Sequence, residues 1–513
     1  MSTSLISSTR AGEYISGGLP YLPFIVVAAV VASYVKAWFK LRKFKGPLLA
    51  SFSESWIFKT AYTGEMHLRL ADTVKKYGPS NSAHLVRIGP NELISDDPDV
   101  GRHMSAARLK HSKTGWYASL KVDPYVDNIF SELDPIKHDK LRGQISSAFQ
   151  MKENPQLGAQ IDLAISSFID LIERKYISSS DCVRPMDFAL VAQYFSLDVV
   201  SSFVFGQPFG DLATDQDIHG YVSTINAVLP FVTMCSSTPT LGRIMNQRWL
   251  MNLVGPSPKD EKGQGKLMAI AQEYVGQRFG PNKVEARDML GSFLSHGMSR
   301  RQAESEILTQ ILAGSDTTST AVRSIFLFII SNPQVHSRLL AEIDDGIEKG
   351  RVSSPITDEE AKDIPYLQAC IQEGLRIWPP FTGMLMKKTN PGGEVIKGTF
   401  VPGGTSVGHC GWGMQRGPEF GEDVEVFRPE RWLEADPDRK RHMERTVDII
   451  FGSGRWACLG KAIVRAELNK IFVELLRRFN FFLLHPNKPW DSRNYTLFLQ
   501  NKMWVRVTRR EKA

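Results

Sequence analysis

The chain has 513 residues, of which 42% are hydrophobic and 23% charged, and its formal net charge is +7. This composition is typical of a globular protein with a large core, and it excludes a chain that is disordered throughout. The five cysteines are scattered and odd in number, without a CxxC spacing, which argues against a disulfide framework. We therefore expect a reducing compartment for most of the chain. The sequence also shows no zinc-like cluster of cysteine and histidine.

Residues 19–35, LPYLPFIVVAAVVASYV, carry no charge, and their length is at the lower limit for a helix that spans a bilayer. Five basic residues follow by position 45, so the positive-inside rule leaves the rest of the chain in the cytoplasm. We expect a lumenal tail at 1–18, a transmembrane anchor at 19–35 and a basic linker at 36–50. A cleavable signal peptide and a buried core helix are the alternatives. Because these basic residues supply most of the net charge, that charge does not indicate a nucleic-acid partner.

The remaining elements predict one large domain, residues 51–513, that is mostly helical with a minor β part. Alternation around a Gly-Pro-Asn turn predicts two strands within 82–97. Helical periodicity then dominates from about 137 to 330, and its longest helix begins at a Ser299 cap and ends before Pro333. A helix at 363–378, strands within 395–408, a helix after 459 and terminal strands within 494–510 follow.

The longest predicted helix has a polar interruption at residues 315–319, SDTTS, between two flanks that are apolar nearly all round. Buried polar groups must find partners. A threonine can bond back to the carbonyl one turn earlier, and Gly314 removes a side chain at the same place. We expect a polar notch in which Asp316 and Thr317 form a proton path. The alternative is a helix that is only kinked.

Two further motifs place opposite charges in apolar surroundings. Glu373 and Arg376, in EGLR, share one helix face at i and i+3 and can pair. The motif FRPERW offers Arg431 as a third member. Surface pairs of this kind contribute little, so we expect a structural cluster only if the three side chains are buried.

The loop FGSGRWACLG, residues 451–460, combines one cysteine with three glycines just before an apolar helix. Glycines allow close backbone approach, and free N–H groups beside sulfur favour a thiolate. Together with AGSDTT at 313–318, EGLR and FRPERW, in this order, the loop resembles the cytochrome P450 haem-thiolate monooxygenases. The resemblance covers nearly the whole chain and implies the cytochrome P450 fold, a helical haem domain with small β-sheets.

The resemblance implies that Cys458 is the axial ligand of haem iron. A thiolate ligand favours cleavage of the O–O bond, and its pKa must be lowered by the metal, by N–H groups and by the helix that opens near Leu459. Gly452, Gly454 and Gly460 would let the backbone approach sulfur and porphyrin, and Phe451 would cover the sulfur. The other four cysteines are expected to be plain buried thiols: Cys182, Cys235, Cys370 and Cys410.

Three sites depart from the family pattern at positions that normally contact a haem propionate. Trp456 stands where the family usually has arginine, with Arg455 one residue earlier. His138 replaces a tryptophan four residues before Arg142, and Lys387 replaces an arginine. Arg142 is the clearest propionate contact that the resemblance implies. For His138, Lys387 and Arg455 a solvated basic face is the alternative.

The resemblance is greatest to membrane-anchored enzymes of fungal secondary metabolism at the endoplasmic reticulum. It implies insertion of one oxygen atom from O2 into a lipophilic small molecule, such as a terpenoid, polyketide or alkaloid. Electrons would come from NADPH through a separate reductase, docking near Lys140, Arg455, Lys461 and Arg465. A haem-thiolate isomerase or dehydratase and a haem-binding protein without turnover are the alternatives.

Overall fold

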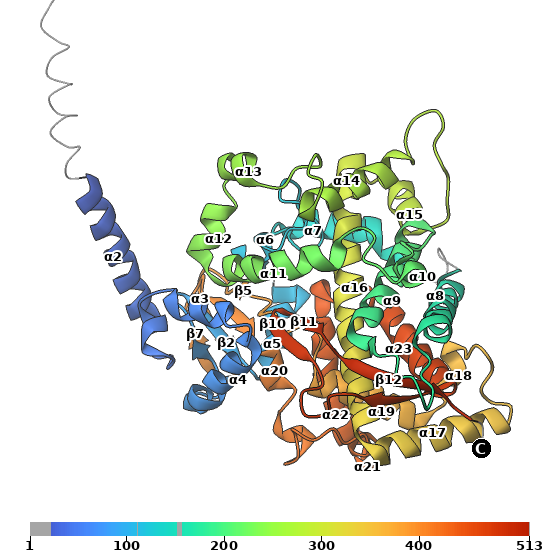
Figure 1. Cartoon of the computed structure of the whole chain (residues 1–513). Helices are drawn as coiled ribbons and strands as arrows, with labels where there is room; N and C mark the ends of the chain where they lie inside the picture. Colours follow the sequence, from blue (N-terminus) through green and yellow to red (C-terminus); the bar gives the residue numbers. More distant parts are fainter. Residues whose placement is uncertain (1–21, 110, 151–155, 512–513) are drawn as a thin grey trace, which may run out of the picture.

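The computed structural model describes residues 22–109, 111–150 and 156–511. Helix α16, Arg300–Ser331, runs through the middle of the helical part, and the other helices pack around it (Figure 1). The short strands form four small sheets within the described residues. The predicted fold class, mostly helical with a minor β part, is confirmed.

The helices beside α16 have the following bounds: α2 Leu22–Leu41, α3 Ser55–Tyr62, α4 Met66–Tyr77, α5 Pro98–Ser105, α6 Gly115–Ala118, α7 Pro135–Ile145, α8 Leu157–Leu171, α9 Phe188–Phe205, α10 Asp211–Thr214, α11 Tyr221–Ser237, α12 Pro239–Met245, α13 Arg248–Val254, α14 Gly263–Gly276, α15 Met289–Ser295, α17 Pro333–Glu348, α18 Asp358–Lys362, α19 Pro365–Ile377, α20 Gly411–Met414, α21 Arg431–Glu434, α22 Pro437–Val447 and α23 Lys461–Leu476. The predicted helices at 299–332, 363–378 and after 459 correspond to α16, α19 and α23.

The strands are β1 Val86–Arg87, β2 Glu92–Ser95, β3 Ser112–Lys113, β4 Met186–Asp187, β5 Lys387–Lys388, β6 Glu394–Ile396, β7 Thr399–Val401, β8 Ser406–His409, β9 Phe479–Leu483, β10 Asp491–Tyr495, β11 Leu497–Asn501 and β12 Trp504–Arg509. The largest sheet has the order β1-β2-β8-β5-β3, and β2 and β8 are its parallel pair. The others are β4-β12-β9 and the hairpins β6–β7 and β10–β11. Each stretch predicted to contain strands does contain them.

The long helix α16 begins and ends where its caps predict. The Ser299 side chain accepts a hydrogen bond from the Gln302 N–H, and Asn332 ends α16 and caps α17, Pro333–Glu348. Helix α16 packs closely on α9 near Gly314, since a Cβ on this glycine would lie 2.8 Å from Cγ2 of Val200. Gly314 therefore serves helix contact rather than only opening space for a ligand.

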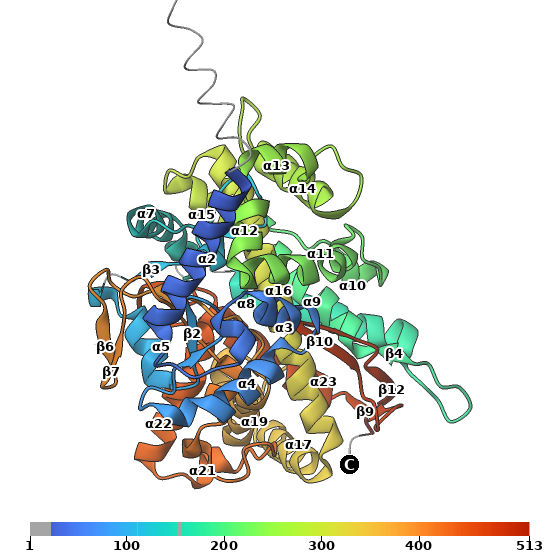
Figure 2. The same ribbon diagram turned by 90° about the vertical axis from the view of Figure 1, so that its left-hand side faces the viewer.

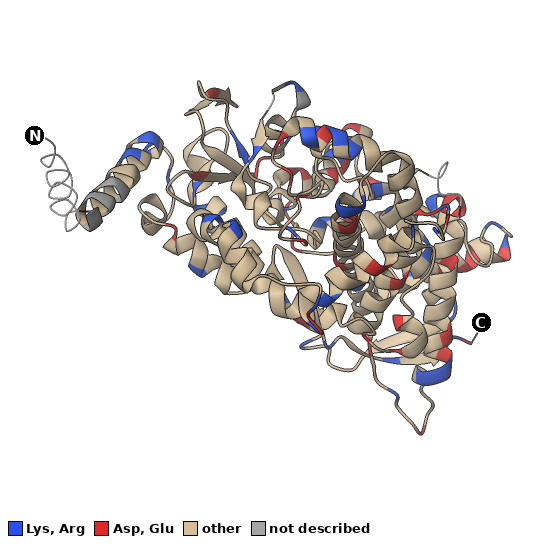
Figure 3. Ribbon diagram, turned by 90° about the horizontal axis from the view of Figure 1, so that it is seen from above, with Lys and Arg blue, Asp and Glu red and all other residues tan. Residues whose placement is uncertain are grey.

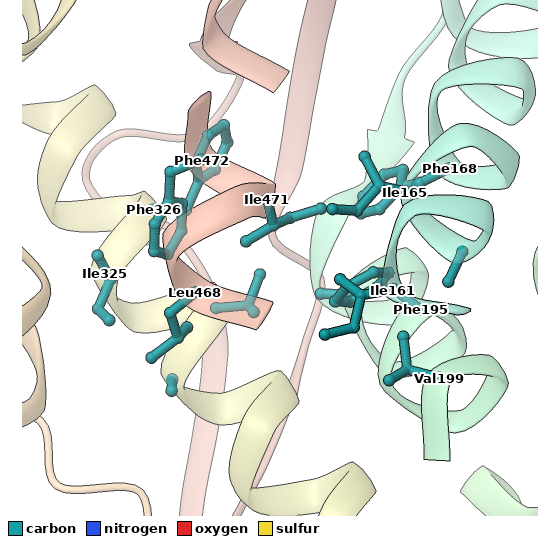
Figure 4. Packing of buried hydrophobic residues seen from close by; sticks show 14 of the residues in the cluster. Ile161, Ile165, Phe168, Phe195, Val199, Ile325, Phe326, Leu468, Ile471 and Phe472 are labelled. Carbon is teal, nitrogen blue, oxygen red and sulfur yellow. The ribbon is translucent and has the colours of Figure 1, made fainter. Parts of the chain in front are cut away.

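The main hydrophobic core joins α8, α9, α16 and α23. Figure 4 shows Ile165 and Phe168 of α8 facing Ile471 of α23, with Phe326 of α16 beside Phe472. Phe326 also stacks on Phe188, with ring centres 4.3 Å apart. This packing fixes α16 and α23 relative to each other. Helix α16 carries the Asp316 notch, and α23 directly follows the Cys458 loop.

Helix α2 projects away from the body of the protein (Figure 1). It continues to Leu41, six residues beyond the predicted anchor, so the basic linker begins as helix. Residues 1–21 lie outside the described part, and with them the predicted lumenal tail and the start of the anchor. Among the described residues, one helix meets the length and composition of a membrane span, and that helix is α9, which is buried in the protein. An N-terminal span therefore stays a prediction.

One cysteine prediction is wrong. Cys235, Cys370 and Cys410 are buried, whereas Cys182 is exposed. Cys182 lies in a polar turn before β4, where its carbonyl accepts a hydrogen bond from the Ser179 N–H at 3.0 Å. The neighbouring serine and aspartate residues favour exposure of this turn to solvent, so the Cys182 thiol is not buried in a hydrophobic core.

Candidate active site

The Glu373–Arg376–Arg431 cluster is fully buried, as its structural role requires. Arg376 and Arg431 both pair with the Glu373 carboxylate, at 2.8 and 2.9 Å. Trp432 Nε1 donates to the same carboxylate at 2.9 Å. The second guanidinium edge of Arg376 donates to the carbonyls of Gln415 and Val424. One carboxylate therefore ties α19 to α21 and to the chain between them.

The Cys458 loop contains two glycines whose backbone conformations other residues rarely adopt. Gly452 and Gly454 have φ angles of +70° and +59°. A Cβ on Gly452 would lie 2.8 Å from the carbonyl oxygen of Trp456. The Cys458 N–H donates to the Phe451 carbonyl at 2.7 Å, which closes the loop.

The backbone reaches the sulfur from the start of α23. A Cβ on Gly460 would lie 3.8 Å from Cys458 Sγ, so the Gly460 backbone passes beside the sulfur. Helix α23 begins at Lys461 with Gly460 as its N-cap, two residues later than predicted. Phe451 is half-buried, and its ring contacts the Lys461 ammonium at 5.6 Å.

Opposing effects act on the pKa of the Cys458 thiol. The side chain is exposed, and yet enough protein surrounds the sulfur that desolvation raises the thiol pKa. The N–H groups of Gly460 and Lys461 and the charge of Arg142 lower it, as predicted, but by less than desolvation raises it. A metal cation at the sulfur would add to the groups that lower this pKa.

Helix α7 brings two predicted cofactor-binding residues to this loop. Arg142 Nη1 donates to the Ala457 carbonyl at 2.9 Å. His138 is buried, and its ring centre lies 4.2 Å from that of Trp456. Desolvation and the Lys113 charge lower the pKa of His138 to about 4, so this imidazole is neutral at neutral pH. Arg455 differs, because it pairs with Asp139 at 3.3 Å at the protein surface.

Two buried lysines lie in the same region, and neither forms an ion pair with a carboxylate in the described part of the chain. Lys387 is 1% exposed, and its Nζ donates to the Ser105 hydroxyl at 3.1 Å and to the Leu385 carbonyl at 3.4 Å. Lys113 Nζ donates to the carbonyls of Ile129 and Phe130 at 3.0 and 2.8 Å. Burial lowers the pKa of each lysine to about 7. A solvated basic face is thus excluded for His138 and Lys387.

Lys113 was not predicted from the sequence. Its Nζ lies 4.6 Å from the Trp456 ring centre and 5.0 Å from that of Tyr117. The motif KTGWY, with a lysine beside two aromatic residues, is the one signal that could have indicated it. In the same region His409 Nε2 is buried without a hydrogen-bond partner among the described residues.

These groups fit the cofactor that the resemblance implies. Buried ammonium groups that meet only neutral oxygens are costly unless an anion accompanies them. Haem carries two propionate carboxylates, and this region offers Lys113, Lys387, Arg142 and the unpartnered His409 nitrogen. The donor set therefore fits a dianionic edge beside the Cys458 loop.

Asp316 and Thr317 point to different surroundings on α16. Asp316 is buried, and its carboxylate accepts from Tyr221 Oη at 2.6 Å and from Gln193 Nε2 at 3.1 Å. Desolvation raises its pKa to about 6. Thr317 is half-buried, next to exposed Ala313, and its hydroxyl bonds back to the Ala313 carbonyl at 2.7 Å. The back-bond predicted for the notch is confirmed.

Tyr221 connects the acid to an apolar pocket and was also missed. Its hydroxyl accepts from Ser315 Oγ at 2.9 Å while it donates to Asp316. The same ring lines a pocket between α11, α14 and α16, with Val122, Phe209, Ile225, Leu267, Ile270, Ala271, Leu308, Ile311 and Leu312. Tyr221 is the first residue of α11 and lies far from the SDTTS motif in the sequence. No local pattern therefore identifies it.

Residues from two segments that are distant in the sequence meet in an aromatic cluster. Phe130 packs 5.2 Å from Tyr117 and 6.4 Å from Phe381, measured between ring centres. Trp116 lies 6.5 Å from Phe381, and Phe381 pairs with Leu497 of β11. The cluster therefore joins residues 116–130 to Phe381 and, through the backbone pairing of Phe381, to β11.

Comparison with known proteins agrees with this geometry. A family model described as cytochrome P450 matches residues 33–507. Cytochrome P450 monooxygenase ABA1 of Pyricularia oryzae is 40% identical over 98% of this chain and 99% of its own length. Cytochrome P450 monooxygenase aba1 of Botryotinia fuckeliana is 38% identical over 92% of each chain, and abl1 of Leptosphaeria maculans 33% over 90% and 82%. The chain belongs to the cytochrome P450 family and is a monooxygenase of that family.

Proposed function

We propose that this enzyme inserts one oxygen atom from O2 into a lipophilic small molecule, as a step of fungal secondary metabolism. The observation that carries the proposal is the difference between two adjacent side chains on α16. Asp316 is a buried acid whose pKa burial raises to about 6, and Thr317 is a half-exposed hydroxyl one residue later. A general acid works best with a pKa near the operating pH, which supports proton delivery from this notch.

Cys458 would hold the haem iron, and Lys113, Lys387, Arg142 and His138 would face the propionates. When bound, haem supplies the binding and reductive activation of O2. The chain's own residues orient the cofactor, exclude water through the packing of α16, and hold a proton on Asp316. Thr317 then offers a hydroxyl on the open face of the helix, within one residue of that proton.

The aromatic cluster around Phe130 supports a lipophilic substrate. Terpenoid, polyketide and alkaloid scaffolds share this character. The similar proteins come from fungi, which supports a fungal pathway. Deleting the gene and comparing metabolites with the parent strain tests this: a lipophilic precursor that lacks one oxygen should accumulate. An unchanged metabolite profile under conditions where the gene is expressed would contradict the proposal.

We further propose attachment to the endoplasmic reticulum membrane through a single N-terminal span, with the catalytic domain on the cytoplasmic side. Helix α2 exposes large apolar side chains along its length: Phe24, Val27, Val31, Val35 and Phe39. Basic residues gather at the end of the helix nearest the domain (Figure 3). Apolar residues followed by basic ones are the order that the positive-inside rule requires. Membrane lipid is thus a proposed partner, and a fusion of residues 1–50 to a reporter should fractionate with microsomes.

Electrons are proposed to come from NADPH through a separate reductase that docks on the proximal face. Lys461 and Arg465 share the partner Asp448, at 2.9 and 3.3 Å, and Arg455 pairs with Asp139. Lys140 is exposed and forms no ion pair among the described residues. It is therefore the strongest candidate for steering an acidic partner. Lys140→Glu should slow reductase-dependent haem reduction at low salt. Lys349→Glu is the control, since Lys349 is the C-cap residue of α17, and it should not change this rate.

Dependence on reductase and NADPH separates this function from its alternatives. A monooxygenase needs both, and product should appear in proportion to the NADPH consumed. A haem-thiolate isomerase or dehydratase would turn over an organic peroxide without NADPH, and a haem-binding protein without turnover would consume no NADPH in the presence of any substrate.

A further inference from the structure

Three side chains from separate parts of the chain meet outside the active site. His103 at the end of α5, His111 just before β3 and Glu394 at the start of β6 place their ligand atoms within 4.8 Å of one another. His103 Nε2 lies 2.8 Å from Glu394 Oε2, and His111 Nε2 lies 2.9 and 3.0 Å from the two carboxylate oxygens. Figure 2 shows the β6–β7 hairpin at the edge of the molecule, near β3 and α5.

Neighbouring backbone groups contact His111 and Glu394 in the way that hydrogen-bond partners orient the ligands of a metal ion. His111 Nδ1 lies 3.2 Å from the carbonyl oxygen of Met104. The Asn390 N–H donates to Glu394 Oε1 at 3.2 Å. Ligating histidines commonly donate their second N–H to a backbone carbonyl, and ligating carboxylates are themselves hydrogen-bonded.

The hydrogen-bond inventory of His111 points to a cation. A neutral imidazole has one N–H and one lone pair. If Nδ1–H donates to Met104, then Nε2 turns its lone pair toward the carboxylate of Glu394, and the two repel. A cation between them removes that repulsion. A second proton on His111 would also do so, and this is the competing explanation: a cluster of ion pairs.

We propose that His103, His111 and Glu394 bind a zinc ion. Two imidazole nitrogens and one carboxylate are a zinc donor set, with bonds of about 2.0–2.2 Å. In a tetrahedron with such bonds the ligand atoms stand roughly 3.3 Å apart, so each histidine nitrogen needs to move only a few tenths of an ångström away from the Glu394 carboxylate. His111 is buried, while His103 has 29% of its side chain exposed, which leaves a route for the ion and a place for water as fourth ligand.

Zinc here would support the region that holds the buried lysines. Lys113 follows His111 by two residues, and Ser105, which accepts from Lys387 Nζ at 3.1 Å, follows His103 by two. The ion would join α5, the start of β3 and the β6–β7 hairpin. We therefore expect it to keep both lysines in position and to slow loss of haem.

The test measures zinc binding directly and so does not depend on the proposed reaction. The full-length holoenzyme is stripped with a chelator, its iron content is checked, and zinc is titrated by calorimetry. Cobalt is used as a spectroscopic probe, because tetrahedral coordination gives intense visible bands. One equivalent should bind, and His103→Asn and Glu394→Gln should each weaken binding at least about 10-fold, the lower end of what loss of an outer partner alone causes.

His442→Asn, an exposed histidine on α22, is the matched control and should bind zinc as the wild type does. His103→Asn changes a partly exposed side chain, so it keeps the test valid if Glu394→Gln folds poorly. Absence of stoichiometric binding by the wild type, or equal affinity in all variants, would show an ion-pair cluster only. Faster haem transfer to apomyoglobin after chelation, reversed by zinc, would support the structural role, and an unchanged rate would refute it.

Discussion

The Nζ atom of Lys113 lies 4.6 Å from the ring centre of Trp456, which stands at a position where the resemblance to the family implies an arginine. Lysine and tryptophan thus form a cation–π pair at the edge of the Cys458 loop. The charge that the loop lacks at position 456 is supplied from a segment more than 300 residues earlier in the chain. This relation explains how the departure from the family pattern can be tolerated.

Replacing Lys113 by Met should weaken haem retention, because the change removes a buried ammonium group while keeping a similar volume. We expect haem transfer to apomyoglobin to accelerate several-fold, with the ferrous–CO spectrum otherwise normal. Lys349→Met, which removes a surface lysine paired with Asp345, is the control and should behave as wild type. Equal rates for both variants would show that Lys113 does not contact the cofactor.

Glu373→Ala should destabilise the protein severely, since it leaves Arg376 and Arg431 buried without their carboxylate. Breaking a buried ion pair in this way costs about 3–5 kcal/mol. Chemical denaturation of the haem-bound protein, or the yield of holoprotein, measures the loss. Glu434→Ala is the control, because its pair with Arg428 is on the surface and such changes stay within about 0.5 kcal/mol. Normal holoprotein yield from Glu373→Ala would contradict the structural role.

The fold and the buried ion-pair cluster could be predicted because their signals are local. Glu373 and Arg376 share a helix face among apolar neighbours, and helix caps such as Ser299 mark the ends of α16. The partners of Asp316 could not be predicted, since Gln193 and Tyr221 lie on α9 and α11 and reach it only in the folded chain. The His103–His111–Glu394 cluster has the same origin.

The error at Cys182 has a local cause. Cys182 was predicted to be buried from its residue type alone, although the surrounding SSSDC favours an exposed turn. The lowering of the Cys458 pKa is predicted to need the haem iron together with the N–H groups, and the balance among the protein groups, in which desolvation outweighs the N–H groups and Arg142, could not be predicted from the sequence. Desolvation depends on how much of the rest of the protein surrounds the sulfur, and spacing in the sequence does not measure this.

The pH dependence of coupling should report Asp316. Burial raises the pKa of this carboxyl to about 6, so its acid form predominates below pH 6 and is lost as the pH rises through 6. Product formed per NADPH should therefore fall between pH 6 and 8. Asp316→Asn should lower the yield and make it independent of pH.

Tyr221→Phe is the companion to that change. The Tyr221 hydroxyl donates to Asp316 and lowers the pKa of its carboxyl, so removing the hydroxyl should move the fall in yield to higher pH. Arg323 also faces Asp316 and acts in the same direction as Tyr221, and it stays in place in this variant. A profile that keeps its midpoint in both variants would exclude Asp316 as the titrating group.

Thr317→Ala should uncouple NADPH consumption from product formation, because the half-exposed hydroxyl is lost while the helix is preserved. Acid–base contributions are typically worth roughly 10²–10⁴-fold, so the loss should be easily measured as product per NADPH. Thr317→Ser keeps the hydroxyl and should retain most of the coupling. If the alanine and serine variants make product equally well, Thr317 is not part of the proton path.

The most direct test is the ferrous–CO spectrum of Cys458→Ser. Thiolate ligation gives a red-shifted Soret band, and the account predicts that this band is absent from Cys458→Ser in protein that still folds. Cys410→Ser, which changes a buried thiol, and Cys182→Ser, which changes an exposed one, should both retain the band. A red-shifted band that persists in Cys458→Ser would contradict the assignment of Cys458 as the haem ligand.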